Sequence, residues 1–321
     1  MFACYEFRVT LSIVSEPTYA PEAVHPRRFG TNYPRLSAYV DEAGHAKDPR
    51  RMILCLAGLV AKNTDWAKFD GQWRQACVEE GISLPFHMRE FAGFRGQFRD
   101  WTEERRRRAL GKLIRAISDA EAIPIGSVVS VRDFNAFSPR MKKLMKDPYF
   151  MAFQPLTYHM AVAASMVQPI GGPVTMVYAH HPEHSDGVSN AGQLWQGLRK
   201  HNPIISLFME SYVCGEQIDH TPLQAADLWA YELGHHFEVI RPAGGKPRWP
   251  FQQFVQMGLN YDQFTHDFIT YWDARGENGL GKMSRVQKWQ EISLYSPGTV
   301  DRGRRLLRQI LRRARANSLK G

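Results

Sequence analysis

Hydrophobic and polar residues alternate in LSAYVD (36–41), where Leu36, Ala38 and Val40 would share one face of a strand. The next apolar run, MILCLAGLV (52–60), is continuous, which is typical of a strand buried on both faces. Further strands are predicted at IPIGSVVSV (123–131), VTMVYA (174–179) and IISLFMESYV (204–213). The pattern therefore predicts five strands, two before a long helical segment and three after it.

Apolar residues at helical spacing predict four helices between these strands. They span about 65–80, 102–119, 148–167 and 188–200. Gly81 would end the first helix, and Thr102 would introduce the second, whose first turn carries two acids. Pro155 lies inside the third helix and is expected to kink it. The aromatic and charged segment 86–100 is expected to be a loop.

The last core helix has the clearest start in the sequence. Thr221 is a good N-cap, Pro222 would occupy the first helical position, and Gln224 the third. This arrangement is a capping box, and the helix is expected to continue to about Val239. Proline and glycine residues between 242 and 250 would end it.

Without the helical segment after the second strand, this order of elements is that of ribonuclease H. We therefore expect an α/β fold with a ribonuclease-H-like mixed sheet flanked by helices, a helical insertion at about 62–120 and a helical C-terminal extension. The expected organisation is an N-terminal arm (1–34), the ribonuclease-H-like domain (35–240), an extension packed on it (241–300) and a basic amphipathic tail (301–321).

Composition narrows the class of protein. The chain has 321 residues, 44% of them hydrophobic and 23% charged, which is ordinary for a globular protein. Its four cysteines form no CxxC pair, which favours reduced, structural thiols. The N-terminus carries charges within its apolar stretch and fits a signal peptide poorly, and no apolar run is long enough to span a membrane. We expect a cytoplasmic protein with no membrane partner.

The positive charge is concentrated at the C-terminus. Residues 301–321 hold +7 of the formal charge of +9, so the preceding 300 residues hold only +2. The tail predicts a helix with an apolar stripe among its arginines, which could bind DNA or RNA, dock on the body of the protein or lie on an anionic membrane. The candidate nucleic-acid-binding residues are Arg304, Arg305, Arg308, Arg312, Arg313 and Arg315.

Two groups of acidic residues are candidates for chemistry. Asp41 and Glu42 end the first predicted strand, where acids are often simply solvated. Asp227 lies in LQAADLWAY, a helical stretch that otherwise reads as core, where an ionised carboxylate needs a partner or a cation. A salt bridge or a hydrogen bond to a neighbouring strand is the alternative to a metal site. An acid at a strand end facing an acid on a helix is the arrangement that binds Mg²⁺ or Mn²⁺.

Several motifs together resemble one known family. They are DEAGH after AYV, FHMREF followed by Trp101, DPYF, and TPLQAADLWAYE. This set resembles the domain-of-unknown-function family numbered three thousand eight hundred over about residues 36–240. Members open with Asp-Glu-Ser-Gly and close with Leu-Gln-x-Ala-Asp, are similar to ribonuclease-H-like nucleases, and are common near mobile elements and defence genes. The resemblance implies a site at Asp41, Glu42 and Asp227, with His87 nearby.

The sequence departs from the family pattern at two places. Ala43 stands where the family usually has serine. A ribonuclease-H-like site also usually has an acid at the end of the strand that here reads TMVYAHH, where Ala179 and His180 stand instead. Glu183 is the candidate for this third catalytic and metal-binding acid, with Asp186 or a histidine of the same loop as alternatives. Residues that could line the site are His87, Glu90, His180, Asp186 and Gln224.

The histidines and one arginine run also have simpler interpretations. Neither His180, His181 and His184 nor the pair His235–His236 shows HExxH or zinc-finger spacing, so they can be surface or capping residues. The run Arg105–Arg108 is expected to form a solvated helix face.

Two functions from different classes follow. The first is a metal-dependent nuclease in which Asp41, Asp227 and a third acid hold one or two Mg²⁺ or Mn²⁺ ions and Glu42 binds metal or orients water. The alternative is a catalytically inactive module that binds nucleic acid or a partner. The sequence leaves open DNA versus RNA and the oligomeric state, a homo-oligomer included.

Overall fold

The computed structural model of the chain describes residues 35–44, 52–139, 142, 148–167, 173–180, 185–201, 208–258 and 260–264. The predicted N-terminal arm (1–34) and basic tail (301–321) lie outside the described residues.

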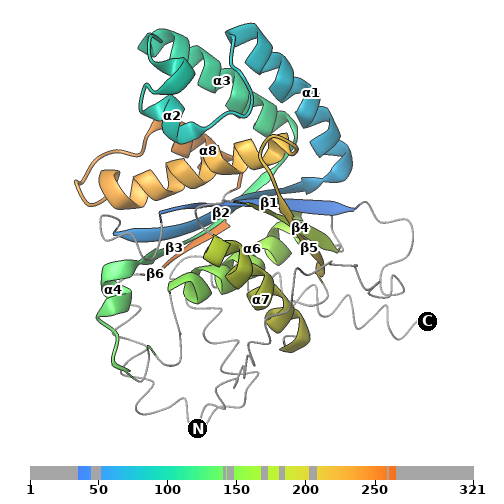
Figure 1. Ribbon diagram of the computed structural model, residues 1–321, viewed down its shortest axis with the longest axis vertical. Coiled ribbons are helices and arrows are strands. Elements are labelled where there is room, and N and C mark those ends of the chain that lie inside the picture. The colour runs from blue at the N-terminus through green and yellow to red at the C-terminus, as the bar shows by residue number, and fades with distance from the viewer. Residues whose placement is uncertain are drawn as a thin grey trace.

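A six-stranded mixed sheet forms the centre of the protein (Figure 1). Its strands are β1 (Leu36–Ala43), β2 (Ile53–Lys62), β3 (Ile123–Ser130), β4 (Val174–Ala179), β5 (Met209–Gly215) and β6 (Asn260–Phe264). They lie in the order β5-β4-β1-β2-β3-β6. β2 pairs antiparallel with both β1 and β3. β4 is parallel to β1, and β5 is parallel to β4. The first five strands thus have the ribonuclease-H-like arrangement, and β6 adds a parallel strand beside β3.

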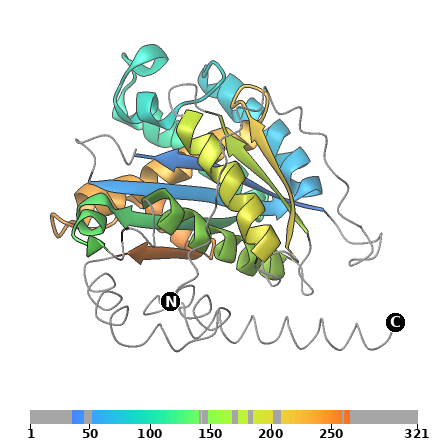
Figure 2. The ribbon, with the colours of Figure 1, turned by 60° about the horizontal axis from the view of Figure 1, so that its bottom comes forward.

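Helices cover both faces of the sheet (Figures 1 and 2). One face carries α6 (Pro148–Val167) and α7 (Ser185–His201), and the other carries α8 (Thr221–His235). The insertion between β2 and β3 lies over α8 and comprises α1 (Asn63–Glu80), α2 (Met88–Ala92), the 3₁₀ turn η2 (Gly96–Phe98) and α3 (Glu103–Asp119). The remaining helices are α4 (Val131–Asn135), the π-helical turn η5 (His236–Ile240) and α9 (Trp249–Gln256). The predicted α/β class and helical insertion are confirmed.

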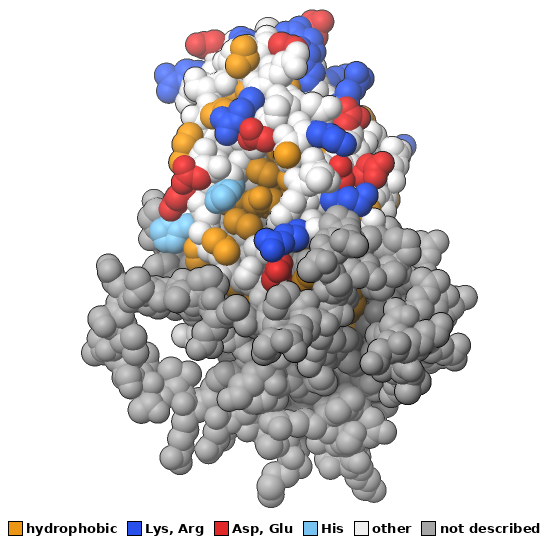
Figure 3. Space-filling view, turned by 90° about the vertical axis from the view of Figure 1, so that its right-hand side faces the viewer, with side chains coloured by type: hydrophobic (Ala, Val, Ile, Leu, Met, Phe, Trp, Pro, Cys, Tyr) orange, Lys and Arg blue, Asp and Glu red, His pale blue; other side chains and the backbone are white. Residues whose placement is uncertain are grey.

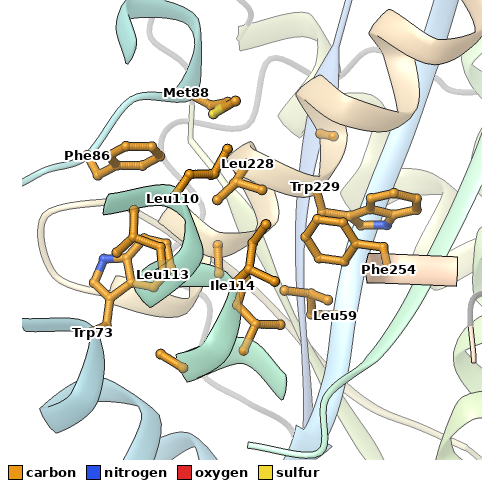
Figure 4. Close-up of a cluster of buried hydrophobic side chains, with 14 of the residues drawn as sticks. Leu59, Trp73, Phe86, Met88, Leu110, Leu113, Ile114, Leu228, Trp229 and Phe254 are labelled. Atoms are coloured by element: carbon orange, nitrogen blue, oxygen red, sulfur yellow. The ribbon is translucent and has the colours of Figure 1, made fainter. Parts of the chain in front are cut away.

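The sheet separates two hydrophobic cores. Leu36, Ala38 and Val40 of β1 join the core beneath α6 and α7. The alternate residues Tyr39 and Ala43 contact the larger core that contains α8 and the insertion. Figure 4 shows part of this second core, in which Trp73, Phe86, Met88, Leu110, Leu113, Ile114, Leu228, Trp229, Phe254 and Leu59 pack together. The period-2 pattern of β1 therefore sends neighbouring side chains to different cores.

The predicted end of α1 and the predicted start of α3 are confirmed. Gly81 ends α1 with a left-handed φ of +67°, and Thr102 caps α3 by accepting a hydrogen bond from the backbone N–H of Arg105. The prediction of a loop over 86–100 is wrong, because α2 and η2 lie in it. Phe86, Phe91 and Phe98 of this segment are buried against one another, and this packing stabilises turns too short to show a helical period.

The predicted start of α8 is wrong in detail. His220 is the N-cap, and Thr221 is the first helical residue, whose Oγ1 donates to Asp70 Oδ1 of α1 at 2.6 Å. Gln224 does not reach back to form a capping box, because its side chain is fully buried and bonded to other elements. The α-helix ends at His235, and η5 continues the chain to Ile240. Tertiary partners thus replaced the local capping bonds.

The interpretation of Arg105–Arg108 as a solvated face is wrong for part of the run. Arg106 is 8% exposed and its guanidinium lies over the rings of Phe91 and Phe94. Arg108 pairs with the buried carboxylate of Glu80 at 3.0 Å. Hydrogen bonds from Arg108, and then from Lys112, lower the pKa of Glu80 to about 2 although burial opposes this. Arg108 thus joins α3 to α1, and Arg106 joins α3 to the segment of α2.

Two expectations from composition can be compared with the described residues. No helix among them is both long enough and apolar enough to cross a membrane. Cys55, Cys77 and Cys214 are free thiols, as predicted, and Cys4 lies outside the described range.

Candidate active site

Asp41 is a buried carboxylate on the α8 face of β1. It is 1% exposed and follows the same alternation as Tyr39 and Ala43. Its Oδ1 accepts a hydrogen bond from the backbone N–H of Glu42 at 2.7 Å, and its Oδ2 accepts one from Gln217 Nε2 at 3.0 Å. Burying an ionised carboxylate costs several kcal/mol unless donors or a cation compensate it, and these two donors supply part of that compensation.

Glu42 points to the opposite face of the sheet. Its Oε2 accepts a hydrogen bond from the Tyr178 hydroxyl of β4 at 3.0 Å, and that hydroxyl also bonds Tyr149 of α6. Burial, followed by the neighbouring Tyr149 and Glu42, raises the pKa of Tyr178. Asp41 and Glu42 are therefore adjacent in sequence but belong to two different polar groups.

Three neighbouring strands end close to Asp41. In the parallel register of β1 and β4, Val40 is opposite Tyr178, so β4 ends level with Asp41 while β1 continues to Ala43. His180 directly follows β4, and its Nδ1 lies 2.7 Å from Glu216 Oε1 in the loop after β5. A carboxylate at one ring nitrogen orients an imidazole, as is usual for metal-binding histidines. Gln217, the next residue of this loop, holds Asp41.

Gln224 of α8 connects this loop to the insertion. Its Nε2 donates to the Gln217 carbonyl at 2.8 Å, while its Oε1 accepts from Trp73 Nε1 and from the backbone N–H of Phe86, both at 3.0 Å. One turn later, Asp227 Oδ2 accepts from the backbone N–H of Met88 at 2.7 Å. Asp41, Gln217 and Gln224 thus form a hydrogen-bonded row that ends beside Asp227 on the same face of α8.

Asp227 is less buried than the sequence suggested. Asp227 is half-buried, whereas all the other residues from Thr221 to Ala230 are buried. The hydrogen bond from Met88 to Asp227 holds the first turn of α2 against α8. Such a structural hydrogen bond is the kind of role that the sequence offered for Asp227 as the alternative to binding a metal. His87 is the N-cap of α2 and is half-buried. It lies between Phe86, whose backbone N–H donates to Gln224, and Met88, whose backbone N–H donates to Asp227.

The oxygen atoms of this group of side chains suit a hard divalent ion as ligands. Asp41 and Asp227 provide carboxylate oxygens, and Gln217 provides a further oxygen, because its buried Oε1 has no hydrogen-bond partner among the described residues. A buried acceptor without a donor costs about 1–3 kcal/mol, and a cation would remove that penalty. In the described part of the chain, no three or more His, Cys, Asp and Glu side chains are grouped as metal ligands. The carboxamide oxygen of Gln217 would therefore have to complete the ligand set.

The described part of the structure does not bring the remaining predicted site residues together with Asp41 and Asp227. Glu183 lies outside the described residues, and Asp186 belongs to α7, where its side chain is not among those described. Glu90 is exposed on α2, with its carboxylate near Gly96. The predicted nucleic-acid-binding residues Arg304, Arg305, Arg308, Arg312, Arg313 and Arg315 lie outside the described residues.

Sequence reasoning missed Glu216 and Gln217. They stand in the polar segment EQID, between a predicted strand and the last predicted helix. Loops at the carboxyl ends of parallel strands commonly carry functional residues, so this position was the available signal. No protein-family model and no curated protein matches this chain.

Proposed function

We propose that the protein is a divalent-metal-dependent nuclease whose site is centred on Asp41 and Asp227. The observation that carries the proposal is the buried, unpartnered Gln217 Oε1, which belongs to the same amide that holds the buried Asp41 carboxylate. The ribonuclease-H-like strand order supports it, because β1 and α8 bring one acid each to the same face. The proposal includes membership of the family named above and Mg²⁺ or Mn²⁺ as the ion.

In this proposal Asp41, Asp227 and Gln217 Oε1 hold the ion. A bound divalent ion lowers the pKa of a coordinated water and offsets the charge of a phosphodiester. Gln217 Nε2 fixes the orientation of Asp41, and Gln224 fixes the loop that carries Gln217. His180, oriented by Glu216, is available to move a proton or to act as a ligand in place of the missing strand-end acid.

The experiment measures cleavage of labelled single-stranded and duplex DNA and RNA with Mg²⁺, with Mn²⁺ and with chelator. Asp41→Asn and Asp227→Asn should each lower the cleavage rate by at least about 100-fold, because each replaces a charged metal ligand with a neutral one and outer-shell changes alone cost about 10- to 100-fold. Asp119→Asn, at an exposed carboxylate of α3, is the matched control and should cleave as the wild type does.

Melting curves must show that both Asn variants are folded. Undiminished cleavage by either folded variant would remove that acid from the site, and cleavage that persists in chelator would exclude the metal mechanism.

One observation favours the alternative of an inactive binding module. β4 ends at Ala179 and is followed by His180, so the described residues hold no acid at this strand end. A protein that binds nucleic acid but cleaves none of the four substrates with either ion would support this alternative.

A further inference from the structure

The insertion presents one aromatic side chain in an unusual backbone conformation. α2 ends at Ala92, and Phe94 follows with a left-handed φ of +52°. The backbone N–H of Arg95 donates to the Glu90 carbonyl at 2.9 Å, so Phe94 occupies the position where such helix ends usually carry glycine. A bulky side chain is strained in this region of φ and ψ, and strain of this kind is concentrated at functional sites.

The ring of Phe94 is both supported and accessible. The Arg106 guanidinium lies 3.9 Å from the ring centroid, and Arg106 itself is 8% exposed. Glu103 and the Ala92 carbonyl hold that guanidinium at 3.0 and 3.4 Å. Phe94 nevertheless remains 40% exposed. The guanidinium covers one face of the ring and holds it in place, and the exposed part of the side chain is available to a ligand.

Three exposed arginines lie close to Phe94 in the sequence. Arg89, Arg95 and Arg99 are exposed and form no ion pair within the described part of the chain. Glu90 lies among them and Asp100 directly follows Arg99, so residues 88–100 hold three arginines and two acids. On the face of the protein that Figure 3 shows, basic and acidic side chains are interspersed on the described surface.

This aromatic and basic segment lies next to the candidate active site. α2 begins at Met88, whose backbone N–H donates to Asp227. α2 rises about 1.5 Å per residue as far as Ala92, and the two residues after it add at most about 3.6 Å each, so Phe94 lies within roughly 13 Å of that bond. Up to about four stacked nucleotides span this distance. A strand that placed a phosphodiester at Asp227 could therefore reach Phe94 with a nearby base.

We propose that Phe94 stacks on a base of single-stranded nucleic acid while Arg89, Arg95 and Arg99 contact its phosphates. Aromatic rings combined with arginines are the usual chemistry for binding single strands, and a base must be unstacked to present its face. The proposal rests on the proposed nuclease function and identifies single strands as the substrate class.

The experiment measures binding of a labelled single-stranded oligonucleotide to the full chain in chelator, so that cleavage plays no part. Phe94→Leu should weaken binding roughly 5- to 150-fold, which is the range for losing one stacked base, and Phe94→Trp should retain it. Phe94→Gly should lose binding without a lowered melting temperature, because glycine relieves the left-handed strain. Arg95→Gln should flatten the slope of log K against log salt by about 0.7. Trp249→Leu, at an aromatic residue 42% exposed on α9, is the matched control.

Unchanged single-strand affinity in Phe94→Leu would overturn the proposal, and so would an equal loss of affinity for duplex, or a wild-type protein that binds no single strand. Strong wild-type binding that Phe94→Leu weakens, without any cleavage, would support this inference while contradicting the nuclease function. Cleavage by a Phe94→Leu protein with wild-type affinity would contradict this inference alone.

Discussion

The side-chain amide of Gln217 donates a hydrogen bond to the buried carboxylate of Asp41 across 3.0 Å, although 176 positions separate the two residues. Gln217 is itself 8% exposed, and its side-chain oxygen has no hydrogen-bond partner among the described residues. Gln217 thus stabilises the Asp41 carboxylate through Nε2, and its Oε1 is an acceptor that no described donor uses.

Replacing Gln217 should change both stability and metal response. Gln217→Leu removes a donor from Asp41 and should lower the free energy of unfolding by about 1–3 kcal/mol. It should also reduce the rise in melting temperature that Mn²⁺ produces in the wild type, because an oxygen ligand is lost. Gln217→Glu places a second carboxylate beside Asp41, so its instability should be greatest without metal and should be relieved by Mn²⁺.

Gln256→Leu, at an exposed glutamine at the end of α9, is the matched control. A wild-type response to Mn²⁺ in Gln217→Leu would remove Gln217 from the ligand set.

Gln224 should contribute far more to stability than a capping side chain does. Gln224→Leu leaves the Trp73 indole N–H, the Phe86 N–H and the Gln217 carbonyl without their partner. Because all three groups are bonded to a fully buried side chain, the free energy of unfolding should fall by about 3 kcal/mol or more. Urea denaturation measures this loss. Gln75→Leu, at an exposed position of α1, should change stability by less than about 0.5 kcal/mol. An equally small loss for Gln224→Leu would contradict the buried network.

Glu232 should make the protein less stable as the pH rises through the weakly acidic range. Burial raises its pKa from 4.5 to about 7, although Arg248, 3.4 Å away, opposes the shift. The unfolded chain therefore releases this proton before the folded protein does, and the free energy of unfolding falls between pH 4.5 and about 7. The loss, on the order of 3 kcal/mol, persists above that range.

Glu232→Gln cannot ionise, so it should be more stable than the wild type at pH 8 and close to it at pH 4.5. Melting curves across this range test the prediction, with Glu121→Gln as an exposed control. A pH profile identical to that of the wild type would show that Glu232 is not the titrating group.

The basic tail should supply most of the sequence-independent affinity for nucleic acid. If about four or five of its seven arginines contact phosphates, deleting residues 301–321 should flatten the slope of log K against log salt on duplex DNA by roughly 4 units. Melting temperature should change little. If the tail instead docks on the body, deletion should lower the melting temperature and leave the slope unchanged. Titrations at several salt concentrations, with melting curves, distinguish the two.

The sequence by itself determined the order of the first five strands and of the longer helices between them, because apolar periodicity is local and survives in a single segment. It also placed Gly81 and Thr102 correctly, since a helix end needs only a few neighbouring residues. It did not predict α2, η2 or the sixth strand, β6. The alternation in β1 already implied that Asp41 and Glu42 face opposite sides, although both were assigned to one site. These features depend on contacts within a few positions.

Only the tertiary structure decided the partners of the buried polar groups. Thr221 and Gln224 have the sequence of a capping box, but they bond instead to Asp70 and Trp73 in α1. Gln217 has no local pattern that marks it as the partner of Asp41. A buried donor must find an acceptor wherever the packed chain supplies one, and the low dielectric of the interior makes that bond outweigh a solvated local alternative. Such partners lie far apart in sequence, so no short window of residues contains them.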